Sequence, residues 1–186
     1  MRIVGGFLKG KKIDFLKSVT TRPLRDFVKE NIFNIIKHSN LNIIKLENAN
    51  VLDLYSGVGS FGIECISRGA KKSTFVENDT KALIVLKKNL STLKIENQSE
   101  VFNEKTSFFF NRLNNKDKFE IIFFDPPFAE DFIIEELKII KESKIYKKKH
   151  LIIIHREEKS DNNFDLLINI LITKSYGRSK IIFATF

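Results

Sequence analysis

The chain has 186 residues, 42% of them hydrophobic, a length typical of a single domain with one core. Its 32 basic and 23 acidic residues give a net charge of +9, which suits an acidic partner such as nucleic acid. One cysteine, Cys65, excludes an internal disulfide and a cysteine-based zinc cluster, and we expect it to be a small buried residue. The apolar runs are shorter than the ~18 residues of a membrane span, and no secretory signal pattern is present, so we expect a cytoplasmic protein.

The first thirty residues concentrate the positive charge. They hold eight lysines and arginines but only three carboxylates. Their net charge of +5 is more than half of the +9 of the whole chain. Clustered cations beside a glycine-punctuated hairpin predict a phosphate-contacting surface, and a solvated basic face is the alternative. Apolar residues at helical spacing, Val28, Ile32, Ile35 and Ile36, then predict a helix. The candidate RNA-binding residues are Arg2, Lys9, Lys11, Lys12, Arg22 and Arg25.

Residues 51–62 read as a strand, a glycine-rich turn and the start of a helix. Gly57 and Gly59 would let the backbone turn tightly beside a ligand, and Gly62 would let the helix pack closely on the sheet. Glu77 ends a second strand twenty residues after Gly57, the spacing at which a carboxylate binds ribose hydroxyls in dinucleotide sites. Both NAD and S-adenosyl-L-methionine fit this pattern.

Asp53 discriminates between these two cofactors. It ends the first strand, four residues before Gly57. A carboxylate there would repel a pyrophosphate but can receive the ammonium group of a methionine-derived cofactor. The sequence therefore favours S-adenosyl-L-methionine over NAD.

Further elements alternate between strands and helices, as a doubly wound sheet requires. Helices are predicted near 83–93 and 133–140, and the later strands near 73–76, 100–103, 119–124, 151–154, 166–172 and 180–186. The last two strands form an antiparallel hairpin. Phe108, Phe109 and Phe110 are expected in the core, and the lysine run 147–149 is expected just before the fifth strand as an aggregation gatekeeper. The glycine turn, Glu77 and Asp125 would converge at strand carboxyl ends.

Asp125, Pro126, Pro127 and Phe128 follow the buried strand at 119–124. The strand must stop at Pro126, which has no N–H for the ladder. Asp125 offers an acceptor for an amino N–H, the Pro-Pro turn can aim a carbonyl at a second N–H, and Phe128 offers a face for base stacking. Two fixed acceptors would orient a nitrogen lone pair toward an electrophile, so the pattern indicates methyl transfer to a planar amine. A simple strand-ending turn is the alternative.

Separated segments together resemble one family, the RsmD-type methyltransferases, which methylate the exocyclic N2 of a guanine in small-subunit (16S) ribosomal RNA. The matching segments are 2–6 with 10–12, 21–23 with 28–34, the glycine turn, 76–79 and 125–128. The resemblance implies an α/β, Rossmann-like class I S-adenosylmethionine-dependent fold. This fold has a mostly parallel seven-stranded sheet, an antiparallel C-terminal hairpin and a small N-terminal β-hairpin and helix extension. It implies one methyltransferase domain over 1–186, with 1–45 facing RNA and 46–186 as the catalytic core.

The same resemblance assigns roles by position. Asp125, Pro126 and Pro127 become the amine clamp and Phe128 the base-stacking group. The cofactor contacts that it implies are Asp53, Tyr55, Gly57, Gly59, Glu77, Asn78, Asn103 and Glu104. No metal is implied, and the implied partner is small-subunit ribosomal RNA, within an assembling 30S particle, for a monomeric enzyme. Glu64 also matches a family position.

Two departures from the family pattern bear on function. Lys105 stands where relatives usually place an acceptor for the adenine amino group, so Asn103, Glu104 or a backbone group must take that role. His155 stands where relatives often carry an acidic residue. We expect His155 to be structural, because methyl transfer to an amine needs no strong base.

Three other functions remain open. A DNA adenine-N6 methyltransferase would keep every central residue. A nicotinamide-dependent dehydrogenase would explain the glycine turn and Glu77, but not Asp53 or residues 125–128. A non-catalytic RNA-binding relative is the third, and Lys105 is its best support.

Overall fold

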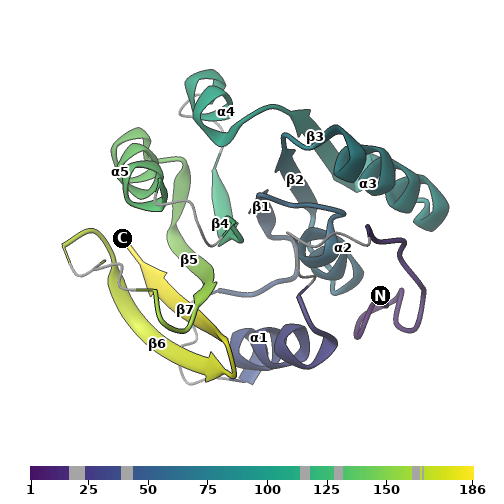
Figure 1. The fold of residues 1–186 in the computed structure, drawn as a ribbon, viewed down its shortest axis with the longest axis horizontal. Coiled ribbons are helices and arrows are strands. Elements are labelled where there is room, and N and C mark those ends of the chain that lie inside the picture. Colours follow the sequence, from purple (N-terminus) through teal and green to yellow (C-terminus); the bar gives the residue numbers. More distant parts are fainter. Residues whose placement is uncertain (17–23, 39–43, 114–117, 128–131, 161–163, 165) are drawn as a thin grey trace.

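The computed structural model describes residues 1–16, 24–38, 44–113, 118–127, 132–160, 164 and 166–186 (Figure 1). A central seven-stranded sheet has the order β3-β2-β1-β4-β5-β7-β6. Its strands are β1 Asn50–Leu54, β2 Lys72–Glu77, β3 Ser99–Asn103, β4 Phe119–Phe124, β5 Tyr146–Glu157, β6 Asn169–Tyr176 and β7 Ser179–Thr185. The helices are α1 Asp26–His38, α2 Ser60–Ser67, α3 Thr80–Leu93, α4 Thr106–Arg112 and α5 Ile133–Ser143, with a short 3-10 turn, η1 Glu96–Gln98.

Strands β1 to β5 are parallel, and β7 runs antiparallel to both β5 and β6. A two-residue loop joins β6 to β7, and Gly177 within it adopts a left-handed φ of 66°. The predicted α/β sheet and its C-terminal antiparallel hairpin are confirmed. The N-terminal hairpin is reduced to an isolated antiparallel bridge between Arg2 and Lys12.

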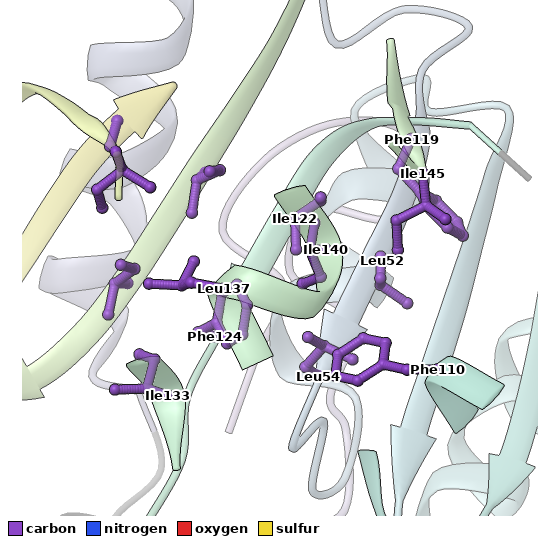
Figure 2. Close-up of a cluster of buried hydrophobic side chains, with 14 of the residues drawn as sticks. Leu52, Leu54, Phe110, Phe119, Ile122, Phe124, Ile133, Leu137, Ile140 and Ile145 are labelled. Carbon is purple, nitrogen blue, oxygen red and sulfur yellow. The ribbon is translucent and has the colours of Figure 1, made fainter. Parts of the chain in front are cut away.

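Helices cover both faces of the sheet (Figure 1). Apolar residues of α4 and α5 pack on one face, where Leu137 and Ile140 lie over Leu52, Ile122 and their neighbours (Figure 2). On the other face α1 and α2 pack on β1, β4, β5 and β7, and α3 packs on α2 with the N-terminal segment. Parallel strands buried on both faces explain the continuous apolar runs of the sequence.

Cys65 on α2 is fully buried, as expected, among the apolar side chains that α1 and α2 pack against the sheet. Burial raises the pKa of its thiol well above the usual value. None of the helices within the described ranges has the length and apolar character of a membrane span.

Two boundaries differ from the sequence predictions. β5 begins at Tyr146, so lysines 147–149 lie inside the strand rather than before it, because Tyr146 pairs with Phe119 of β4. β6 begins at Asn169, not near residue 166, since the preceding residues form a turn on the carbonyl of Phe164. Leu166 is accordingly 94% exposed.

Some inward-facing side chains also differ. The buried face of α1 includes Lys29 and Phe33, whereas Ile35 and Ile36 are only half-buried. Of the three phenylalanines expected in the core, Phe109 and Phe110 are buried. Phe108 is 60% exposed, because successive residues of the helix α4 point in different directions.

Candidate active site

The polar residues singled out in the sequence lie at the edge of the sheet where the parallel strands end. β1 ends at Leu54, β2 at Glu77, β3 at Asn103 and β4 at Phe124. The register pairs Leu54 with Val76 on one side and Phe124 on the other, so the loops after β1, β2 and β4 begin side by side. Ligands of open α/β sheets bind at this edge.

The glycine turn between β1 and α2 depends on two close approaches. Gly59 has a φ of 86°, and a Cβ at this position would lie 2.4 Å from Leu86 Cδ1. A Cβ on Gly62 would lie 2.3 Å from Phe75 Cε1, so this glycine lets α2 pack against β2, as the sequence predicts. Open space lies where a Cβ of Gly57 would stand, which leaves room for a ligand beside the backbone.

Asp53 is buried beneath this turn, with 1% of its surface exposed. Its Oδ2 accepts a 2.9 Å hydrogen bond from the Gly62 N–H. The pKa of this carboxyl is raised from 3.8 to about 8, chiefly by burial. The negative charges of Asp125 and Glu77 add to this rise, and the bond from Gly62 opposes it. Within the described ranges, no cationic side chain forms an ion pair with Asp53. A ligand cation beside Asp53 would favour its ionised form.

Glu77 ties the glycine turn to the end of β2. Its Oε2 accepts a 2.7 Å hydrogen bond from the Gly57 N–H, and its Oε1 accepts bonds from the N–H groups of Asn78 and Asp79 at 2.9 and 2.8 Å. These three backbone donors hold the carboxylate in place without a ligand. Each oxygen retains acceptor capacity for a ligand hydroxyl.

A cavity of about 340 Å³ opens next to Glu77. Its walls come from the ends of β1, β2 and β3 and from the helices α4 and α5. It brings together four of the residues proposed for the cofactor: Tyr55, Glu77, Asn78 and Glu104. Asp53, Gly57, Gly59 and Asn103 are not part of its lining.

Glu104 has the most informative position in this cavity. Its Oε1 is buried and has no hydrogen-bond partner among the described residues, while its Oε2 lies 3.4 Å from Arg112 Nε. A buried unpaired acceptor in a cavity wall can receive an amino group from a ligand. Lys105 also lines the cavity but carries only donors, and Asn103 is exposed.

Asp125 opens the Pro-Pro turn directly after β4. Its N–H bonds to the Leu54 carbonyl at 3.4 Å, and its side chain is 28% exposed. The Oδ1 atom lies 2.7 Å from Nδ1 of His155. Pro126 is buried and Pro127 exposed. Phe128, for which the sequence predicts base stacking, lies outside the described residues.

A buried polar cluster in the cavity wall was missed by the sequence analysis. Tyr55 has a left-handed φ of 58°, rare for a bulky residue, and its hydroxyl donates a 2.7 Å hydrogen bond to Glu136 Oε1. Thr106 donates its hydroxyl to the same oxygen. Glu136 lies between Ile133 and Leu137 on the predicted inward face of α5, so its helical spacing could have indicated a buried acid.

The N-terminal segment is anchored by buried charges. Lys29 Nζ lies 3.7 Å from Glu64 Oε2, and both side chains are fully buried. The same Nζ donates to the Arg2 carbonyl at 2.8 Å, and Glu64 accepts further bonds from the Val4 N–H and from Arg68 Nε. Burial lowers the pKa of Lys29, and the negative charge of Glu64 opposes this. Glu64 therefore fastens the N-terminal segment to α2.

The basic residues proposed for RNA fall in two places. Arg2 and Lys12 pair near Ser60, at the end of α2 that adjoins the glycine turn. Lys9 lies on the hairpin turn near Ser67, at the opposite end of α2, because the neighbouring Leu8 N–H bonds to Ser67 Oγ. Of the others, Lys11 and Arg25 are exposed, and Arg22 lies outside the described residues.

The sheet order and the antiparallel C-terminal hairpin are those of the class I S-adenosylmethionine-dependent methyltransferase fold. A solved methyltransferase structure from Escherichia coli has a TM-score of 0.83 and 26% identity, covering 99% of this chain and 96% of that one. A methylase crystal structure from Haemophilus influenzae has a TM-score of 0.78 and 30% identity, with coverages of 98% and 96%.

The chain belongs to the Conserved hypothetical protein 95 family, whose model matches residues 1–185. Ribosomal RNA small subunit methyltransferase D of Haemophilus influenzae is 35% identical over 159 residues, 85% of this chain and 79% of the relative. The protein of the same name from Buchnera aphidicola (subsp. Acyrthosiphon pisum) is 33% identical over 157 residues, with coverages of 84% and 78%. The resemblance to the RsmD-type family is thereby confirmed.

Proposed function

We propose that this protein transfers a methyl group from S-adenosyl-L-methionine to the exocyclic N2 amine of a guanine in small-subunit ribosomal RNA. The structural observation that carries the proposal is the presence of two carboxylates at the carboxyl ends of the neighbouring strands β1 and β4. Asp53 on β1 is buried and has no cationic partner in the described part of the chain, and Asp125 is partly exposed directly after β4. The first suits the ammonium of the cofactor and the second suits an amine. The relatives named ribosomal RNA small subunit methyltransferase D support the choice of substrate.

The residues present offer partners for the ammonium, the ribose hydroxyls and the adenine amino group of the cofactor. Asp53 would pair with the ammonium, and Glu77 would accept hydrogen bonds from the ribose hydroxyls. Glu104 would accept a hydrogen bond from the adenine amino group, because its buried Oε1 lies in the cavity wall and has no partner among the described residues. Lys105 then needs no role in adenine recognition. Gly57 leaves space for the cofactor beside the backbone.

The reaction needs orientation more than acid–base catalysis. Asp125 would accept a hydrogen bond from one N–H of the amine and a proline-turn carbonyl would accept the other, which aims the nitrogen lone pair. When bound, S-adenosyl-L-methionine supplies an electrophilic methyl group, and its sulfur keeps the electron pair of the broken carbon–sulfur bond. The guanine nitrogen forms the new carbon–nitrogen bond and then loses one proton to solvent. Phe128 would stack on the base, and cations of the N-terminal segment would contact phosphates.

The first test is transfer of tritiated methyl to small-subunit ribosomal RNA and to its assembly particles from a methylation-deficient strain, followed by nucleoside mass spectrometry. We expect N2-methylguanosine. The Asp125→Ala variant should lose most turnover while it still binds the cofactor. Label on adenine, or only on DNA, would refute the guanine target and favour an amino methyltransferase for another substrate. Failure to bind S-adenosyl-L-methionine, with no label on any substrate, would refute catalysis and favour the non-catalytic RNA-binding function.

A further inference from the structure

The carboxylate of Asp125 is held by a side chain from the neighbouring strand. Oδ1 of Asp125 lies 2.7 Å from Nδ1 of His155. An ionised carboxylate can only accept hydrogen bonds, so Nδ1 of His155 carries the hydrogen of this contact. The His155 side chain is 7% exposed and the Asp125 side chain 28% exposed. The contact therefore links a buried ring to a carboxylate that solvent and ligands can reach.

The register of the sheet, and not the loop after β4, brings Asp125 and His155 together. β4 and β5 are parallel, and their register pairs Phe124 with Ile154. Asp125 directly follows Phe124 at the end of β4 and His155 follows Ile154 within β5, so the two residues lie side by side. On its other side His155 is paired with Ile181 of β7. The imidazole is thus held between two strands, whereas Asp125 stands where β4 has ended and the Pro-Pro turn begins.

The contact gives the two carboxylate oxygens of Asp125 different roles, because it is Oδ1 that contacts His155. A carboxylate at the start of a loop can rotate, and either oxygen can then face a ligand. With Oδ1 held by His155, rotation is restrained and Oδ2 is left to accept a bond from the substrate. A fixed acceptor keeps the reacting nitrogen in line with the methyl group, and a misplacement of about 1 Å can lower a rate by about 10²-fold.

We propose that His155 is a positioning residue for Asp125, which holds Oδ1 so that Oδ2 faces the amine of the nucleobase. The inference rests on the proposed methyl transfer and goes beyond it, because it assigns a role to a side chain that methyl transfer does not itself require. In this proposal His155 does not touch the reacting atoms and acts through Asp125.

The chain offers a matched control in His150. It lies on the same strand and is similarly buried, with 4% of its surface exposed. Its Nδ1 contacts the Lys147 carbonyl at 2.8 Å, and its Nε2 accepts a bond from the Phe186 N–H. Because strands rise by about 3.3 Å per residue, five residues place His150 about 16 Å from the catalytic edge.

The test compares His155→Phe with His155→Asn, whose side-chain amide can place an N–H near the position of the imidazole Nδ1. We expect His155→Phe to lower kcat about 10²-fold, with KM for cofactor and RNA within about twofold of wild type. His155→Asn should restore most of the rate. In an Asp125→Asn background, His155→Phe should cause no comparable further loss. The same substitutions at His150 should leave kcat unchanged. Circular dichroism and thermal midpoints confirm that each variant is folded.

The outcomes separate this inference from the proposed function. Wild-type protein that transfers no methyl group to any RNA or DNA would overturn the proposed function and this inference with it. Wild-type transfer to guanine with an unaltered kcat in folded His155→Phe would overturn the inference alone. Equal loss in folded His155→Asn and His155→Phe would also overturn it, because the hydrogen bond would then have no part in the effect. A ¹⁵N spectrum of the ring gives an independent readout: we expect a protonated Nδ1 whose signal shifts in Asp125→Ala.

Discussion

Replacement of Asp53 by asparagine should change how the stability of the protein depends on pH. The pKa of this carboxyl is 3.8 in an unperturbed chain and about 8 in the folded protein. Folding therefore favours the protonated form, and the free energy of unfolding should fall as pH rises between these two values. Each pKa unit corresponds to 1.36 kcal/mol, so this group alone should make the free energy of unfolding at pH 7 lower than its value at acidic pH by on the order of 4 kcal/mol.

An asparagine at position 53 has a similar shape and can still accept the hydrogen bond from the Gly62 N–H, but it cannot ionise. Without cofactor, the variant should therefore gain stability over wild type as pH rises, and the gain should change by about 3–4 kcal/mol between pH 5 and pH 8. Urea unfolding followed by circular dichroism, at several pH values and without cofactor, measures this difference. A stability difference between variant and wild type that is independent of pH would refute the reasoning, because the pKa of Asp53 would then be the same in the folded and unfolded protein.

The same replacement should abolish stabilisation by S-adenosyl-L-methionine, since the ammonium would lose its partner. Cofactor binding to wild type at pH 7 should release close to one proton, because a bound ammonium favours the ionised carboxylate. Calorimetry in buffers of different ionisation enthalpy measures this release. Tight binding by Asp53→Asn without proton uptake or release would contradict the proposed ammonium contact.

Three further predictions concern the cavity, the anchor and the RNA surface. Glu104→Gln has a single amide oxygen, which cannot face both Arg112 and the adenine amino group, so it should weaken cofactor binding about tenfold in calorimetry, and Asn103→Ala should change it little; the reverse order would contradict the adenine assignment. Lys29→Met should lower the free energy of urea unfolding by about 3 kcal/mol, because it leaves Glu64 buried beside one fewer cation; an unchanged value would show that the pair is not needed. Replacing Lys9, Lys11 and Lys12 by glutamine should weaken RNA binding and lower the magnitude of the slope of log K against log salt concentration by up to about three, whereas the same replacement of lysines 147–149 should not. Equal effects of the two triple replacements would show that the N-terminal lysines make no special contact with RNA.

The fold was largely predictable because its signals are local. Apolar runs such as 119–124 mark strands buried on both faces, and helical spacing marks the segments between them. The errors fall where tertiary pairing extends or shortens an element. β5 gains residues 146–150 because Tyr146 pairs with Phe119, and β6 loses its first residues to a turn on the Phe164 carbonyl. Phe108 points away from the core because a helix exposes one face of an all-phenylalanine run.

Sequence alone determined which chemistry-bearing residues follow the strands, because strand ends and glycine turns are marked by their own residues. Asp53, Glu77 and Asp125 were therefore identifiable as neighbours in space. Only the tertiary structure decided what each carboxylate contacts. His155 lies thirty residues after Asp125 and Glu136 lies eighty-one after Tyr55, so no local pattern indicates either pair. The register of parallel strands and the packing of α5 create these contacts, and burial then sets the charge state of Asp53.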